Sequence, residues 1–195
     1  PQGLIARSTN QRDALLLASR TYLKMVEVYY QTDVIPLSFL SNFRALNLAD
    51  RAGESGELAE SFVTLGNGLG FIPLHRIASS YLNHALRIAE KPDYVRSRPY
   101  VWLAYAYYRT GIGDWDTAIE YFKQLREMSR ASGDERRYGD AIANLAHIMG
   151  LRGQYDDALL FTEELYVSGT RRGISRFVAE AMCERAQYLI YKGEH

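Results

Sequence analysis

Cysteine, proline and long apolar runs are all scarce in this chain of 195 residues. The single cysteine, Cys183, excludes a disulfide within the chain. Only five prolines occur, so long helices are permitted almost everywhere. No run approaches the roughly 18 apolar residues of a membrane-spanning helix, and the N-terminus lacks the pattern of a signal peptide. These absences predict a helical, cytoplasmic protein.

The chain also has no excess of charge of either sign. Its 23 Lys and Arg residues balance 23 Asp and Glu residues, which gives a formal net charge of zero. We therefore expect no generic electrostatic attraction to nucleic acid or to an anionic membrane. Apolar residues make up 47% of the sequence, which is enough to bury a core. Nothing in the composition indicates an enzyme.

An internal repeat becomes visible when the sequence is shifted by 40 residues against itself without gaps. Small residues coincide at two positions of this register, and large apolar residues coincide at a third. The first small series is Ser38, Ala78, Ala118 and Ala158. The second small series is Val26, Gly66, Ala106, Ala146 and Ala186, and the large series is Tyr22, Phe62, Trp102, Ile142 and Met182. Antiparallel helices approach closely only where small side chains admit a bulky neighbour, so this alternation predicts packed helix pairs.

Each repeat is expected to be a helix, a short turn and a second helix. Apolar residues recur at three and four residues, the period of a helix, and no segment indicates a strand. Gly113, Gly153 and Gly193 are placed to end first helices in a left-handed cap. The first helices are predicted at residues 12–31, 56–70, 99–111, 135–151 and 174–192. The second helices are predicted at residues 36–51, 74–91, 115–131 and 155–168.

This pattern resembles the tetratricopeptide repeat family. The fourth copy resembles it best, with Asn144-Leu145-Ala146, Gly153-Gln154-Tyr155 and Ala158. The third copy adds Trp102, Ala106, Gly113, Trp115, Ala118 and Phe122. The usual period is about 34 residues, so a 40-residue period resembles the long-helix variety of kinesin light chains, Leu-Gly-Asn-type adaptors and bacterial regulatory proteins. Ser38, Pro73 and Arg185 depart from the family pattern.

The resemblance implies an all-α fold, namely a right-handed superhelical solenoid of antiparallel helix pairs with about four and a half repeats. We expect one domain over residues 1–195. The repeats would span about 12–53, 54–93, 94–133 and 134–173, with an incomplete copy at 174–195. Because the sequence begins at Pro1 and stops where a fifth second helix should start, we expect a fragment of a longer multidomain protein.

No group of side chains in the sequence suggests catalysis or a bound cofactor. Gly66-Asn67-Gly68-Leu69-Gly70 looks like a phosphate-binding loop, but it falls inside an expected helix, where packing explains Gly66 better. The four histidines lack the spacing of metal ligands, and Cys183 has no paired histidine nearby in the sequence. We therefore expect a protein that is not an enzyme and that holds neither metal nor cofactor.

The family resemblance also indicates where a ligand would bind. First helices in that family line a concave groove and contact an extended peptide. The corresponding positions here are Lys24, Glu27, Tyr30, Thr64, Asn67, Tyr100, Tyr107, Asn144, His147, Glu184 and Gln187. Asn and Gln can bond an extended backbone, and Tyr combines apolar contact area with a polar tip. The alternative interpretation is that these side chains are solvated or pack between repeats.

The charges of these positions bear on the kind of ligand. A well-known groove of the family grips a C-terminal carboxylate through several cations on successive first helices. Lys24 is the one cation at the corresponding positions here, so that activity is not expected. A mixed or partly basic ligand fits better.

Three arginines form a second candidate site. Arg96, Arg136 and Arg176 occupy equivalent positions before successive first helices, so they would line one edge of the stacked repeats and suit an acidic partner. The alternative is that acids in the same loops neutralise them. Such ion pairs contribute little to stability when they lie at the surface. Those acids are Asp93, Asp134 and Glu135.

The leading hypothesis is a non-enzymatic scaffold that binds a protein or peptide ligand, or neighbouring domains of the same polypeptide. It would be the sensor or regulatory segment of a larger bacterial signalling or transcription-regulating protein. The alternative is self-association through an uncapped apolar face that includes Met182, Ala186 and Leu189. An enzymatic, small-molecule or nucleic-acid role comes last, because the charge is neutral and no site is evident.

Overall fold

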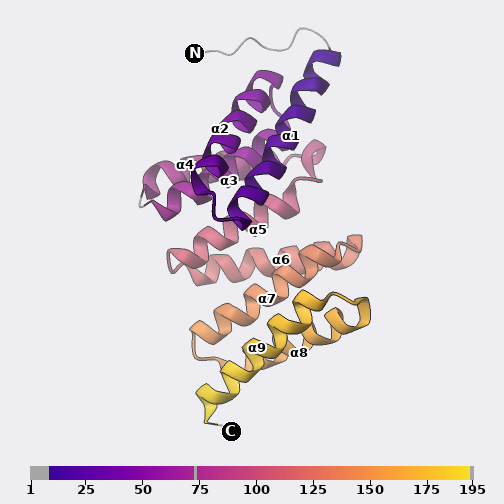
Figure 1. Ribbon diagram of the computed structural model, residues 1–195. Coiled ribbons are helices and arrows are strands. Elements are labelled where there is room, and N and C mark those ends of the chain that lie inside the picture. Colours follow the sequence, from indigo (N-terminus) through magenta and orange to yellow (C-terminus); the bar gives the residue numbers. More distant parts are fainter. Residues whose placement is uncertain (1–8, 73, 194–195) are drawn as a thin grey trace. The chain divides into compact units, whose positions relative to one another are not determined.

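The structure, a computed structural model, describes residues 9–72 and 74–193. Within these ranges every predicted helix is present and no strand occurs (Figure 1). The helices are α1 (Thr9–Gln31), α2 (Ile35–Ala52), α3 (Gly56–Phe71), α4 (His75–Ala89), α5 (Arg98–Gly111), α6 (Trp115–Ser132), α7 (Glu135–Leu151), α8 (Tyr155–Arg172) and α9 (Ser175–Lys192). The all-α fold of helix pairs is thereby confirmed. Pro1 and Pro73, which entered the sequence interpretation, lie outside the described residues.

The end of α4 differs from the prediction. The helix was expected to reach residue 91 but ends at Ala89, and a turn of 3-10 helix, η1 (Pro92–Tyr94), follows it. Proline disfavours the helical conformation of the residue before it, and Lys91 is accordingly extended, with φ −71° and ψ 143°. Pro92 then starts η1, because its fixed φ suits the first position of a helical turn.

Glycines in the left-handed conformation end the helices at repeat intervals. Gly113, Gly153 and Gly193 have φ values of 82°, 73° and 78°, which confirms their predicted role after first helices. Gly133 and Gly173 do the same after the second helices α6 and α8, with φ values of 72° and 68°. Only glycine adopts this conformation without a steric penalty, so these residues set where each helix stops.

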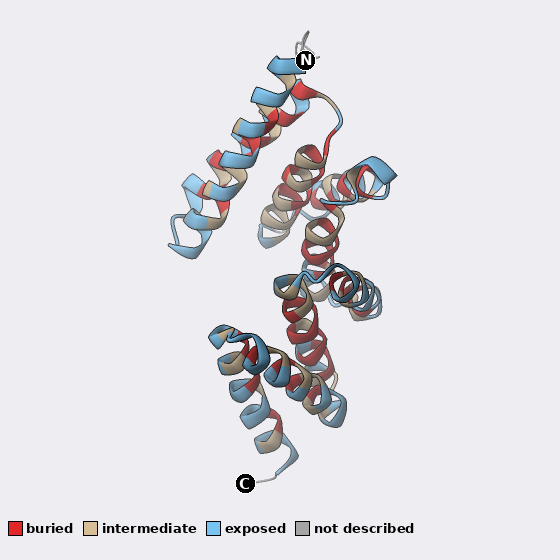
Figure 2. Ribbon diagram, turned by 90° about the vertical axis from the view of Figure 1, so that its right-hand side faces the viewer, coloured by how far each residue is buried: buried red, intermediate tan, exposed pale blue. Residues whose placement is uncertain are grey.

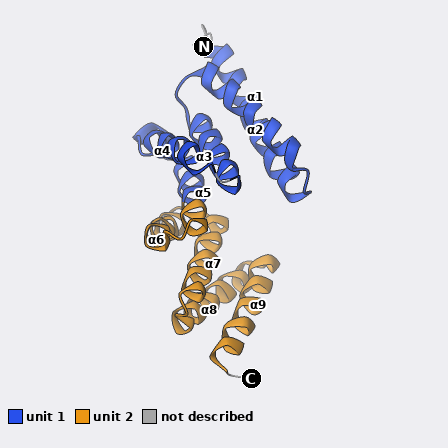
Figure 3. Ribbon diagram, turned by 90° about the vertical axis from the view of Figure 1, so that its left-hand side faces the viewer, with its two compact units in different colours: residues 1–105 blue, residues 106–195 orange. Residues whose placement is uncertain are grey.

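The described helices belong to two compact units, residues 1–105 and residues 106–195, with the boundary inside α5 (Figure 3). The prediction of a single domain therefore stays a prediction. In the first unit, α1 packs on α2 and α3 packs on α4. In the second unit, α7 packs on α6 and on α8, and α8 also packs on α9.

Small residues allow the helices of the first unit to approach closely. Val26 and Ala45 are buried between α1 and α2, and the Ser19 hydroxyl donates a hydrogen bond to the Ala45 carbonyl at 2.9 Å. On α3, a Cβ added to Gly66 would lie 2.7 Å from Leu82 Cγ. Gly66 therefore serves close packing inside a helix, which confirms the packing interpretation of the glycine-rich segment.

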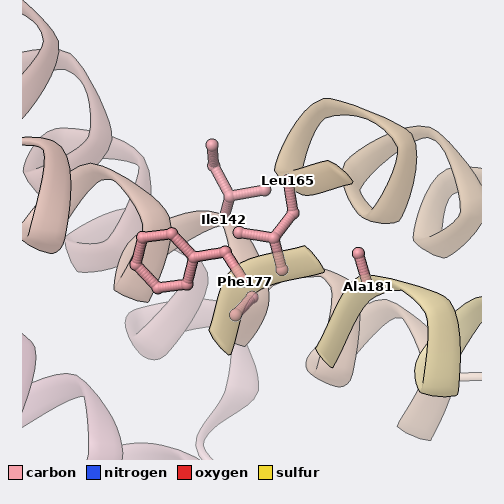
Figure 4. Close-up of a cluster of buried hydrophobic side chains, with 5 residues drawn as sticks. Ile142, Leu165, Phe177 and Ala181 are labelled. Carbon is pink, nitrogen blue, oxygen red and sulfur yellow. The ribbon is translucent and has the colours of Figure 1, made fainter. Parts of the chain in front are cut away.

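The core of the second unit is built in the same way. Ile142 of α7, Leu165 of α8, and Phe177 and Ala181 of α9 form a buried cluster (Figure 4). Gly139 gives the Phe177 ring its space, because a Cβ there would lie 2.1 Å from the ring. Buried positions, red in Figure 2, accordingly follow the faces that packed helices turn toward one another.

The cap at Gly133 gives a first prediction. Gly133→Ala should lower the free energy of unfolding by about 1–2 kcal/mol, because alanine is strained at positive φ. No atom lies within 4 Å of the added Cβ, so steric contact does not contribute to this effect. Urea unfolding followed by circular dichroism measures the change.

Gly111→Ala is the matched control, because Gly111 lies at the helical end of α5 and also has open space around its Cβ. Alanine is favoured over glycine in a helix, so this control should be neutral or stabilising by up to about 1 kcal/mol. Equal destabilisation by both substitutions would contradict the assigned role of Gly133.

Candidate protein-binding surface

Polar contacts join successive first helices at a regular sequence separation. Within the first unit, the Thr64 and Tyr100 hydroxyls lie 3.0 Å apart at a sequence separation of 36 residues. Asn67 Nδ2 donates to the Ala104 carbonyl at 2.8 Å over 37 residues. A separation of 36 or 37 is one 40-residue repeat less about one helical turn, so the contacts follow from the repeat itself.

These contacts support the packing alternative for three of the predicted groove residues. Thr64, Asn67 and Tyr100 are half-buried, and each is bonded to the next first helix or to its neighbour. Elsewhere in the first unit, Lys24 lies 3.7 Å from Glu27, and Tyr30 is 58% exposed. Peptide contact by any of the six stays a prediction.

The second unit brings together five polar side chains from three first helices. We call this surface the first-helix face. It consists of Tyr107 of α5, Asp140 and Asn144 of α7, and Glu180 and Glu184 of α9. The electrostatic interactions of Tyr107 reach both Asp140 and Glu180, which places the three helices on one surface.

Tyr107 and Asn144 are linked directly. Asn144 Nδ2 donates to the Tyr107 hydroxyl at 3.2 Å and to the Asp140 carbonyl at 2.7 Å. The Tyr107 ring packs edge-on against Phe122, yet 45% of the residue remains exposed. Burial raises the pKa of Tyr107, while the bond from Asn144 lowers it. The pair is thus held in place by α6 and α7 and still presents an aromatic surface.

Asp140 is the best-shielded charge of the face, with 8% of the residue exposed. Its carboxylate lies 2.5 Å from Arg176 and 3.4 Å from Arg137. Arg176 also lies over the Phe177 ring, with 4.6 Å from Cζ to the centroid. Arg176 is therefore neutralised by Asp140 and not by the loop acids Asp93, Asp134 and Glu135 that the sequence suggested. Glu180 occupies the same repeat position as Asp140, and Arg176 lies about one helical turn before Glu180. Because of this offset, Arg176 pairs with Asp140 of the neighbouring first helix.

Glu184 has no such counter-ion among the described residues. Its Oε2 atom is buried and accepts no hydrogen bond from the described residues. Burial and the nearby charge of Glu180 raise the pKa of Glu184 to about 7. Burial also raises the pKa of Glu180, which Arg176 partly offsets. The face therefore carries a carboxyl group whose charged form is penalised by burial and would gain from a hydrogen-bond donor or a cation.

The remaining predicted residues lie beside this face. His147 is exposed on α7, and Gln187 on α9 donates to the Tyr191 hydroxyl at 2.9 Å. Cys183 is exposed on α9.

The predicted row of Arg96, Arg136 and Arg176 is only partly accessible to a partner. Arg96 and Arg136 are exposed, and Arg136 has an interaction with another group. Arg176 forms an ion pair with Asp140. Because Arg96 belongs to the first unit and the other two belong to the second, a continuous row of the three stays a prediction.

The sequence interpretation missed Asp140 and Glu180. Both occupy the same position of the 40-residue register as Tyr100, which was selected, and each lies four residues before a selected residue on its own helix. The register alone could therefore have found them. Their importance depends on burial, which the pattern does not show.

Residues 9–72 and 74–193 contain neither a cluster of potential metal ligands nor a helix suited to span a membrane. Among them, no group of three or more His, Cys, Asp or Glu side chains is arranged to hold a metal ion. Over the same ranges, none of the helices combines the length and the apolar character needed to cross a membrane.

This architecture defines a helical-repeat protein, and comparison with known proteins agrees. A solved structure of aspartyl phosphate phosphatase F from Bacillus subtilis is similar, with a TM-score of 0.72 and 16% sequence identity over 94% of this chain. The match spans 48% of that phosphatase, so this chain corresponds to about half its length. No family model matches the sequence, and no curated protein matches it. The likeness shows the fold, which fits the tetratricopeptide type of helical repeat.

The buried carboxyl of Glu184 gives a second prediction. A raised pKa means that the folded state binds this proton more tightly than the unfolded state, so stability falls as the pH rises from about 4.5 to about 7. Glu184→Gln removes that loss. The stability gained by the variant should grow by about 1–2 kcal/mol across this window, after allowance for partial exposure.

Urea unfolding at a series of pH values measures this gain. Glu120→Gln, on the exposed surface of α6, controls for the loss of one carboxylate. A gain from Glu184→Gln that is the same at every pH, or no larger than that of the control, would count against the assigned environment of Glu184.

Proposed function

We propose that this chain is a non-enzymatic scaffold that binds a protein or peptide segment across the first-helix face of its second unit. The observation that carries the proposal is the Tyr107–Asn144 pair, which is fixed by neighbouring helices and remains exposed. A rigid aromatic side chain with a hydrogen-bonding neighbour is typical of residues that dominate protein interfaces.

The polar groups of the face suit a polypeptide ligand. Both amide hydrogens of Asn144 have internal acceptors, whereas its Oδ1 accepts no bond from the described residues. That oxygen is therefore available to a backbone N–H of an extended ligand. Glu180 and Glu184 would favour a donor or a basic side chain, so the preferred ligand is a mixed or partly basic segment.

A regulatory role in a larger bacterial protein is the finer part of the proposal. Its support is the similarity in fold to half of a Bacillus subtilis protein named as an aspartyl phosphate phosphatase. We propose that the present chain supplies binding rather than catalysis, since the first-helix face contains a shielded Asp140–Arg176 pair and hydrogen-bonding groups instead of an activated nucleophile.

Selection from a displayed library of random peptides, followed by fluorescence titration of the recovered peptides, tests this function. Tyr107→Ala should weaken binding by about tenfold or more, because it removes the exposed ring. Tyr107→Phe keeps the ring and loses the hydroxyl, so a smaller loss is expected.

Tyr166→Ala, a partly exposed tyrosine on α8, is the matched control and should leave binding unchanged. Peptides that bind equally well to the wild type, to Tyr107→Ala and to Asn144→Ala would show that the ligand lies elsewhere.

A second candidate function is self-association through α9. Met182 and Ala186 are exposed, whereas the residues at the same repeat positions in α7, Ile142 and Ala146, are fully buried. Ile190 adds to this apolar surface with 60% of the residue exposed. Leu189, which was expected to join it, is half-buried. Residues four apart on one helix form a self-complementary stripe that suits a two-fold contact with a second copy.

Sedimentation equilibrium at several concentrations separates the two candidates. Self-association predicts a concentration-dependent dimer in the wild type and a monomer after Met182→Glu with Ile190→Glu, because charges in a buried apolar contact are costly. Leu160→Glu alters an exposed leucine of α8 and should leave the dimer intact. A wild-type monomer at every concentration would exclude this second function.

A further inference from the structure

A hollow on the other side of α7 is not used by the proposed function. It has a volume of about 380 Å³ and lies within the second unit, between the end of α6, the start of α7 and the end of α8. Its walls include Tyr138 and Val167 as well as three arginines and three glutamates. The three positive and three negative charges would cancel if none of them were paired with a group outside the hollow.

The three glutamates, however, are already neutralised. Glu164 accepts hydrogen bonds from Arg126 Nε at 3.0 Å, from Arg126 Nη2 at 2.7 and 2.8 Å, and from the Tyr138 hydroxyl at 2.5 Å. Glu163 pairs with Arg185 at 2.9 Å. Arg126 and Arg185 are not among the lining residues, so the charges that pair with Glu164 and Glu163 come from outside the hollow. Arg126 also lies 3.4 Å from Glu127, which is outside the hollow as well.

The arginines that line the hollow form fewer ion pairs than its glutamates do. Arg172 pairs with Glu135 at 2.5 Å. Arg130 and Arg171 form no ion pair with any residue in the described part of the chain, and both are exposed. With the glutamates satisfied, the hollow therefore presents two unpaired guanidinium groups, one from α6 and one from α8.

Helix dipoles do not reverse this balance. The start of α7 places the positive end of a helix at the hollow, and the ends of α6 and α8 each place a negative end there. Each partial charge is about half a unit, so the three helix ends together contribute about half a negative charge. The two full charges of Arg130 and Arg171 therefore decide the preference for an anion.

We propose that this hollow receives an acidic side chain of a partner polypeptide, held between Arg130 and Arg171. Guanidinium groups bind planar or tetrahedral oxyanions through paired hydrogen bonds, and Val167 offers apolar contact to the stem of such a side chain. The exposure of Arg130, Val167 and Arg171 suits a side chain arriving from another protein. A free small ligand is usually enclosed over most of its surface.

Fluorescence anisotropy with the full chain tests the proposal. The probes are labelled peptides that differ only at their central residues, which are glutamate, phosphoserine or glutamine, and inorganic phosphate serves as a competitor. The glutamate or the phosphoserine peptide should bind, and the glutamine peptide should not. Arg130→Gln with Arg171→Gln should weaken binding by about tenfold or more, since charge-assisted bonds are lost.

Arg76→Gln with Arg87→Gln is the matched control, because it removes the same charge from exposed positions of α4 in the first unit. Binding should then fall by less than about twofold. Circular dichroism of both double variants checks that helicity is retained. Equal losses in the two double variants, no binding of either anionic peptide, or competition by phosphate at the same concentration as the peptides would each overturn the proposal.

Discussion

The close approach of helices at small residues is the constraint on which the rest of this structure depends. Leu82 occupies the space that a side chain at Gly66 would need, and Phe177 does the same at Gly139. Ala106 and Ala146 are fully buried at the position equivalent to Gly66. Because a bulky residue fits only where its neighbour is small, these positions fix the rotation of each helix about its axis and therefore the side chains that it presents outward.

The polar surface follows from this fixed rotation. Within each unit, a residue of one first helix contacts the next first helix about one turn before the equivalent repeat position. Such contacts therefore recur at sequence separations of 36 or 37 residues, as in Thr64–Tyr100 and Asp140–Arg176. The zero net charge of the chain therefore results from many local ion pairs. It does not mean that the surface lacks charged groups. Where the pairing is incomplete, as at Glu184 and at Arg130 with Arg171, a surface has a defined preference for its ligand.

Sequence reasoning predicted the parts of the fold that repeat. The helices and the glycine caps follow from residue types at a fixed period, and Gly66 was recognised as a packing residue for the same reason. The pairing of Asp140 with Arg176, the buried oxygen of Glu184 and the hollow between α6, α7 and α8 were not predicted. Each depends on the burial and direction of a few side chains across neighbouring helices, and the repeat register carries no information about these.

The central claim is that the first-helix face of the second unit binds a polypeptide segment. Amide chemical-shift mapping of the full chain, during titration with a peptide recovered by library selection, tests it most directly. The account predicts that the largest changes fall within residues 140–147 of α7 and residues 180–187 of α9. Saturable binding that leaves both segments unchanged and shifts only residues of the first unit, or only α6 and α8, would contradict it.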